Sequence, residues 1–158
     1  MPPHSQAVYE QVIEGKVATL GREHADTLST KGNYAIVLED QGKLTEAEQV
    51  YEEVIVGKSE ALGAGHVDTL MSMVNLGNLL LDRASKFEAQ AEMFEEAAGA
   101  GLATGRNGKE AAQAYLTQRV AMDMEKARPL FEEAVTGFMD SLGPKHTHTQ
   151  VRFPCSPV

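Results

Sequence analysis

Four of the five histidines lie in short, similar segments and are the first candidates for a metal site. His24 and His66 stand 42 residues apart, and each precedes an aspartate by two positions. This equivalence predicts residues that recur in a repeated turn and pack or cap there. Only His146 and His148 could chelate a metal together, and two ligands without a third do not make a site. We therefore predict no metal ion.

The glycine-rich stretch around residues 99–110 invites a nucleotide-binding interpretation. Its Gly-Lys step at Lys109 resembles a phosphate-binding loop, but the leading glycine and the following Ser or Thr are missing. Gly99, Gly101 and Gly105 depart from a dinucleotide fingerprint by one extra residue. Both motifs should follow a strand, whereas this stretch follows a predicted helix. We expect an irregular linker and no cofactor.

Pairs of glutamates could be acid/base carboxylates, but they recur at one helical position. The pairs are Glu52-Glu53, Glu95-Glu96 and Glu132-Glu133. An active site needs an unrepeated, desolvated set of groups, so this repetition indicates a solvated outer face. No nucleophile and base stand at a suitable spacing either. The chain is predicted not to be an enzyme.

Composition narrows the classes of partner and compartment. The formal net charge is −9, and no Lys/Arg cluster is longer than two, so nucleic acid is disfavoured and a basic protein partner is favoured. No apolar run approaches the roughly 18 residues of a membrane span, and no signal peptide is recognisable. The single cysteine, Cys155, forms no internal disulfide. We predict a soluble cytoplasmic protein.

An internal repeat organises the chain. Leu20–Leu28 returns as Leu62–Leu70, a shift of 42 residues with six identities in nine. A second sequence element recurs twice at the same 42-residue spacing. Its fourth copy follows the third after only 38 residues, so the third unit is about four residues shorter than the other units. Its copies are Tyr9–Lys16, Tyr51–Lys58, Met93–Gly99 and Phe131–Gly137. A period of this length is typical of a helical repeat array.

Each unit is predicted to contain two helices, because apolar residues recur on a 3.6-residue period and no long alternation is present. The fold class is therefore all-α, an α-solenoid of antiparallel helix pairs with about seven helices. The expected helices are 6–19, 26–41, 44–61, 68–83, 87–101, 108–122 and 124–141. The array is expected over 1–143, with a lone helix 6–19, units of about 20–61, 62–103 and 104–141, and a truncated repeat start with a disordered tail over 144–158.

The first full unit resembles the kinesin light chain type of tetratricopeptide repeat. The resemblance is carried by the Leu-Gly-His-Asp-Thr turn that begins at Leu20, by Asn33, by Gly42-Lys43, and by Glu46-Ala47-Glu48 with Tyr51. It covers about residues 9–150. The third unit lacks the turn motif, so any binding role should weaken toward the C-terminus. HEAT and armadillo repeats have similar periods and are a minor alternative, since they lack this turn.

A polar stripe separate from the apolar face follows each first helix. In the resembled family such asparagines hold the backbone of an extended peptide, which an amide can do because it both donates and accepts hydrogen bonds. The alternative is that Asn33 and Asn75 only bridge neighbouring helices. The candidate groove residues are Ser29, Asn33, Ile36, Met71, Asn75 and Asn78.

These patterns predict a scaffold that binds a partner protein or peptide segment in the groove of the array. The alternative is a structural or oligomerising fragment of a larger signalling or scaffold protein. No polar capping helix is evident, so the ends of the array could associate with each other.

Overall fold

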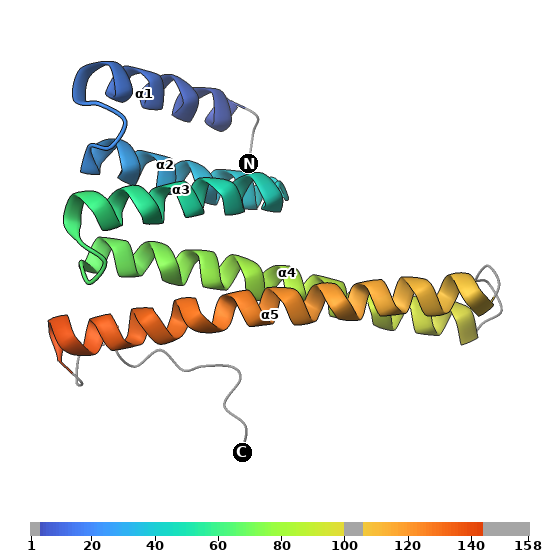
Figure 1. Ribbon diagram of the computed structural model, residues 1–158. Helices are drawn as coiled ribbons and strands as arrows, with labels where there is room; N and C mark the ends of the chain where they lie inside the picture. The colour runs from blue at the N-terminus through green and yellow to red at the C-terminus, as the bar shows by residue number, and fades with distance from the viewer. Residues whose placement is uncertain (1–3, 100–105, 144–158) are drawn as a thin grey trace. The chain divides into compact units, whose positions relative to one another are not determined.

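The computed structural model describes residues 4–99 and 106–143, and within these ranges the chain forms helices and no strand. The fold is all-α, as the helical period predicts (Figure 1). The described residues contain five helices: α1 (His4–Leu20), α2 (Ala25–Asp40), α3 (Leu44–Leu62), α4 (Val67–Gly99) and α5 (Arg106–Leu142).

The prediction of about seven helices is wrong for this part of the chain. Two expected breaks, near residue 85 and near residue 123, fall inside the continuous helices α4 and α5. Gly42 turns the chain between α2 and α3 with φ of 76°, a conformation that favours glycine. The residue 42 positions later is Ala84, which is 2% exposed within α4. Without the glycine the helix continues.

The chain divides into two compact units. The first comprises Met1–Leu76 and Leu130–Val158, and the second comprises Gly77–Pro129. The first unit therefore contains α1, α2, α3, the beginning of α4 and the end of α5.

The repeated turn of the first unit is built from a glycine and a threonine. Gly21 and Gly63 have φ of 96° and 99°, which favours glycine because a Cβ is strained there. Six residues later, the buried Thr27 and Thr69 donate a hydrogen bond from Oγ1 to the glycine carbonyl, both at 2.9 Å. The same contacts in both copies explain why the turn sequence recurs.

Each repeated histidine caps the helix that follows the turn. His24 Nδ1 accepts a hydrogen bond from the backbone N–H of Asp26 at 3.2 Å, and His66 does the same for Asp68 at 3.2 Å. These bonds satisfy N–H groups that a first helical turn leaves without partners. The prediction that His24 and His66 are turn residues is confirmed.

A lysine on the preceding helix contacts the same first turn. Lys16 Nζ and Lys58 Nζ donate to the carbonyl oxygens of Asp26 and Asp68, each at 3.3 Å. Lys58 is buried and also donates to Ser72 Oγ at 3.1 Å. Burial lowers the pKa of Lys58, and the nearby Asp68 carboxylate partly opposes this shift.

The helix pair α2 and α3 closes around a glycine. A Cβ placed on Gly57 would lie 2.7 Å from Leu28 Cδ2, so this leucine packs directly against the backbone of α3. Leu28, Ala47 and Val54 are fully buried at this interface. Close packing of this kind is sensitive to a single added methyl group.

The next pair in the first unit repeats this arrangement with the end of α5. A Cβ on Gly137 would lie 2.7 Å from Leu70 Cδ2. Leu70 forms a buried cluster with Met73, Ala134 and Phe138. The end of α5 thus contacts α4 as α3 contacts α2. The predicted boundaries of the repeat units stay a prediction.

The second unit contains a buried ion pair between α4 and α5. Arg83 donates from Nε to Asp123 Oδ2 at 2.8 Å and from Nη2 to Asp123 Oδ1 at 2.6 Å. Their side chains are only 9% and 4% exposed. The guanidinium of Arg119 also lies 5.7 Å from the centre of the Phe87 ring, within reach of a cation–π attraction.

Candidate peptide-binding site

On α2 the predicted groove residues lie beside the core face. Asn33 is exposed, Ile36 is 43% exposed and Ser29 is half-buried. The adjoining face of the same helix carries Leu28 and Ala35, both at 0% exposure. One face of α2 is therefore packed in the core, while the neighbouring stripe with Asn33 and Ile36 is exposed at the surface.

Contacts with α1 fix the orientation of α2 near this stripe. Tyr34 donates from its hydroxyl to Glu10 Oε1 at 2.9 Å, and Gln6 Nε2 donates to Tyr34 Oη at 3.3 Å. Hydrogen bonds from Gln6 and Tyr34 lower the pKa of the Glu10 carboxyl, while burial and the Glu10 carboxylate raise the pKa of Tyr34. The Tyr9 and Tyr34 rings lie 6.4 Å apart, which adds an aromatic contact.

On α4 the predicted residues are less exposed. Asn75 and Met71 are half-buried, and Met71 packs against the cluster around Leu70 and Phe138. Met71 therefore contributes to the core as well as to the surface. Asn78 is exposed and belongs to the second unit.

The alternative role of the asparagines was to bridge neighbouring helices. Among the hydrogen bonds of residues 4–99 and 106–143, none involves the side chain of Asn33 or Asn75. In that part of the chain, the contacts between helices are made by other side chains, such as Tyr34 with Glu10 and Lys58 with Ser72.

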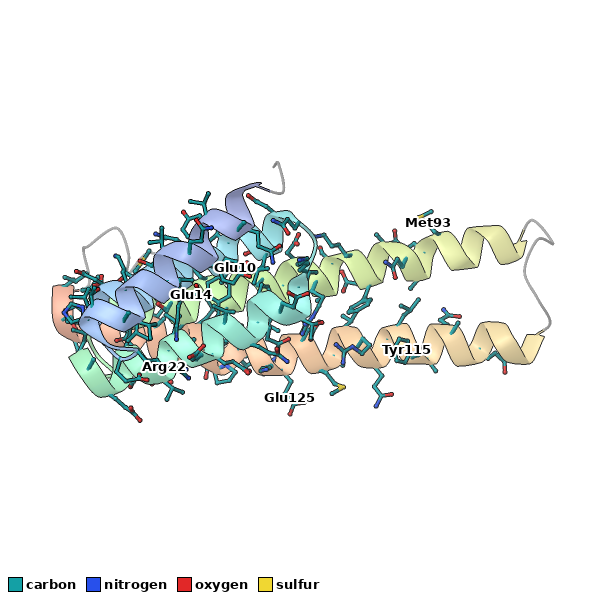
Figure 2. All side chains as sticks on the ribbon, turned by 90° about the horizontal axis from the view of Figure 1, so that it is seen from above. Glu10, Glu14, Arg22, Met93, Tyr115 and Glu125 are labelled. Carbon is teal, nitrogen blue, oxygen red and sulfur yellow. The ribbon has the colours of Figure 1, made fainter. Side chains whose placement is uncertain are left out.

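A cleft of about 470 Å³ lies elsewhere in the first unit, and sequence reasoning missed it. Lys31 is buried, and its Nζ donates to Glu53 Oε1 at 2.6 Å within the lining. Glu14 and Arg22 come from α1 and the turn after it (Figure 2). The cleft includes none of the predicted groove residues. Its lining consists of Ile13, Glu14, Val17, Ala18, Arg22, Lys31 and Glu53.

Two further predictions concern metal ions and membranes. Across the residues that the structure describes, no group of three or more His, Cys, Asp or Glu could hold a metal ion. His146 and His148 lie outside the described residues. Within the same described ranges, every helix is too short or too polar to cross a membrane.

Comparison with protein families identifies the repeat. Residues 26–100 match the family model of the tetratricopeptide repeat. Residues 26–100 carry tetratricopeptide repeats. This match confirms the family predicted from the turn motif, and it begins at Asp26, in the first turn of α2.

Two solved structures are similar to this tetratricopeptide-repeat chain. Both are of nearly identical TPR-like repeats from a putative kinesin light chain of Podosopora anserina, and one of them carries a single substitution. Each is 21% identical, has a TM-score of 0.48, and is matched over 92% of this chain and 71% of its own. No curated protein matches the chain.

Proposed function

We propose that this tetratricopeptide-repeat chain is a protein-interaction module that binds an extended segment of a partner along the stripe of α2. Tetratricopeptide repeats generally mediate protein–protein interactions. The observation that carries the proposal is the exposed pair Asn33 and Ile36 beside the buried Leu28 and Ala35 of the same helix.

The chemistry of the stripe suits an extended backbone. The Asn33 amide donates to a carbonyl and accepts from an N–H, so it satisfies both polar groups of one peptide unit. Ile36 and Met71 provide apolar contact for a side chain of the partner, and the flexible thioether of Met71 adapts to its shape. Asn75 offers a second amide on α4.

The helix is fixed before the partner arrives. Leu28 and Leu38 are buried, and the Tyr34–Glu10 hydrogen bond attaches α2 to α1. A rigid site loses less conformational entropy on binding, so a few well-placed contacts suffice. The formal net charge of −9 favours a basic partner segment at low salt.

The test begins with affinity capture by the full chain, after which the bound segment is identified and synthesised. We expect Asn33→Ala combined with Asn75→Ala to weaken binding of that peptide by about tenfold or more, as for removal of central interface contacts. Isothermal titration calorimetry measures the change.

Gln49→Ala is the matched control, because it removes an exposed side-chain amide from α3 instead of α2 or α4. It should leave the affinity unchanged. If the double variant keeps its helical circular dichroism and binds the peptide as tightly as the parent chain, the groove assignment is wrong.

A further inference from the structure

The cleft of about 470 Å³ in the first unit combines charged groups with an apolar wall. α1 and α3 each pack on α2, and all three helices contribute to the lining. Ile13, Val17 and Ala18 of α1 form the apolar wall. Ligand pockets usually measure about 300–1,000 Å³, so the cleft is large enough for one long side chain of a partner.

The charges of this cleft are not part of the repeat. Three of its four charged residues have uncharged counterparts 42 residues later, namely Glu14 with Val56, Arg22 with Ala64 and Lys31 with Met73. Met73 is 5% exposed and belongs to the buried cluster against which Ile55 packs. The second copy thus has an apolar core side chain where the first has a buried lysine. A repeated structural role does not account for these charges.

The cleft lies on the side of α1 that faces the following helices. In α3, Gly57 packs against Leu28 of the preceding helix, whereas Ile55 packs against the cluster at the start of α4. Ile13 of the cleft stands 42 residues before Ile55 and is its equivalent in α1. The walls of the cleft are therefore those that α1, α2 and α3 form together.

A buried lysine fixes one carboxylate of the cleft. Lys31 Nζ donates to Glu53 Oε1 at 2.6 Å, and the two side chains are 10% and 48% exposed. Burying an ammonium group costs desolvation free energy, which a methionine at this position avoids. The bond to Lys31 uses Oε1, while a carboxylate accepts hydrogen bonds at both oxygens. Glu53 is thus held in place with its second oxygen able to accept from another donor.

The accessible charges favour a cation as the occupant. Glu14, Glu53 and Arg22 are exposed, which gives two negative groups and one positive group (Figure 2). The charge of the buried Lys31 is balanced by its bond to Glu53. The formal net charge of −9 adds a negative field around the whole chain.

We propose that this cleft binds an arginine side chain of a partner protein. The guanidinium pairs with the carboxylates of Glu14 and Glu53, and the methylene stem lies on Ile13 and Val17. Arginine suits the site better than lysine, because its planar group carries five donors that match carboxylates and its stem packs on apolar surface. The kind of partner rests on the proposed function, to which this cleft adds a second contact.

The probe is N-acetyl-L-arginine amide, titrated into the isotope-labelled full chain and followed by nuclear magnetic resonance. We expect saturable shifts at the backbone amides of Ile13, Val17 and Lys31, with a dissociation constant on the order of a millimolar for a ligand of this size. N-acetyl-L-norleucine amide, which has a similar stem without the charge, should bind at least about threefold more weakly.

Glu14→Gln is the decisive variant, because it removes one carboxylate and leaves the Lys31–Glu53 ion pair in place. It should weaken binding of the arginine amide by about threefold, and its combination with Glu53→Gln should abolish saturation. Glu52→Gln is the matched control, since this exposed glutamate of α3 does not line the cleft. It should bind the arginine amide as the parent chain does.

Four outcomes would overturn the proposal. They are the absence of saturable binding, equal affinity for the norleucine amide, an unchanged affinity in Glu14→Gln, and tighter binding of N-acetyl-L-glutamate amide. The last would mean that Lys31 and Arg22 hold an anion instead. Asn33→Ala combined with Asn75→Ala should not affect the arginine amide, so the cleft and the groove can each fail without the other.

Discussion

Two glycines at equivalent positions of the repeat differ in their packing, and this difference should change how a substitution at each affects stability. Gly57 is buried against Leu28, whereas Gly15 faces open space. The residue type is the same because the repeat is the same. Its energetic role depends on whether a neighbouring helix is present.

We predict that Gly57→Ala lowers the free energy of unfolding and that Gly15→Ala raises it. The added methyl at residue 57 overpacks Leu28, which costs about 1–3 kcal/mol, and the better helix propensity of alanine offsets only part of this. At residue 15 only the propensity gain of about 0.5–1 kcal/mol remains. Urea unfolding followed by circular dichroism compares the two, and changes of the same sign would contradict the described packing.

The histidine caps make a second prediction at this scale. His24→Ala removes the acceptor for the Asp26 N–H, so the free energy of unfolding should fall by about 0.5–2 kcal/mol. His24→Asn, which supplies another side-chain acceptor, should recover most of the loss. Thermal unfolding tests this, and an alanine variant as stable as the parent would show that the hydrogen bond contributes nothing.

At the scale of elements, the positions where helices begin were predicted well and two of the breaks were not. The starts of α2 and α4 follow from the turn sequence, whose Gly21–Thr27 and Gly63–Thr69 hydrogen bonds are local. The absence of a break at Ala84 depends on a missing glycine. The repeat pattern predicted a turn there, but the local sequence continued the helix.

The partner of α4 in the first unit could not be inferred from a 42-residue register. Gly137 covers Leu70 from 67 residues further along the chain, whereas Gly57 covers Leu28 from only 29 residues further. A signal was present, because Phe131–Gly143 aligns with Tyr51–Gly63 at a shift of 80 residues. The element recurs at Met93–Gly99 and at Phe131–Gly137, and the sequence alone does not say which of the two packs against Leu70.

The ion pair of the second unit provides the prediction at this scale. Asp123→Asn removes the carboxylate that forms the buried ion pair with Arg83, so we expect a loss of about 3–5 kcal/mol in the free energy of unfolding. The double variant Arg83→Met with Asp123→Leu should recover much of this loss, because it removes both charged members of the buried pair together.

Chemical denaturation of the single and double variants separates the two effects. Asp82→Asn, which breaks the pair with Lys86, is the control, since both of these side chains are about half exposed and such pairs contribute little. A double variant less stable than Asp123→Asn alone would contradict this account.

At the scale of the whole molecule, the all-α class and the repeat family were predicted from the sequence and are confirmed. The assignment of the candidate groove residues stays a prediction. Asn33 and Ile36 are exposed, whereas Met71 is half-buried and packs partly against the core cluster around Leu70. Periodicity places a residue on a helical face, whereas its burial depends on which other helix lies against that face.

The cleft at Lys31 and Glu53 was not predicted. It is formed by tertiary packing, since Glu53 reaches Lys31 from another helix. The pattern of residues within one helix does not show which residues of another helix lie against it.

Because the chain is synthesised from its N-terminus, Leu70 must wait for Gly137 to be made before the two can pack together. A nascent chain grows at about 5–20 residues per second, so Leu28 can be covered within seconds of its synthesis, while Leu70 waits more than twice as long. Contacts between residues distant in sequence also form more slowly, because the loop that joins them must close first. During that interval Leu70 and Met73 lack the cover of Ala134 and Phe138, so the part of their apolar surface that Ile55 of α3 does not contact stays open to chaperones and to other nascent chains.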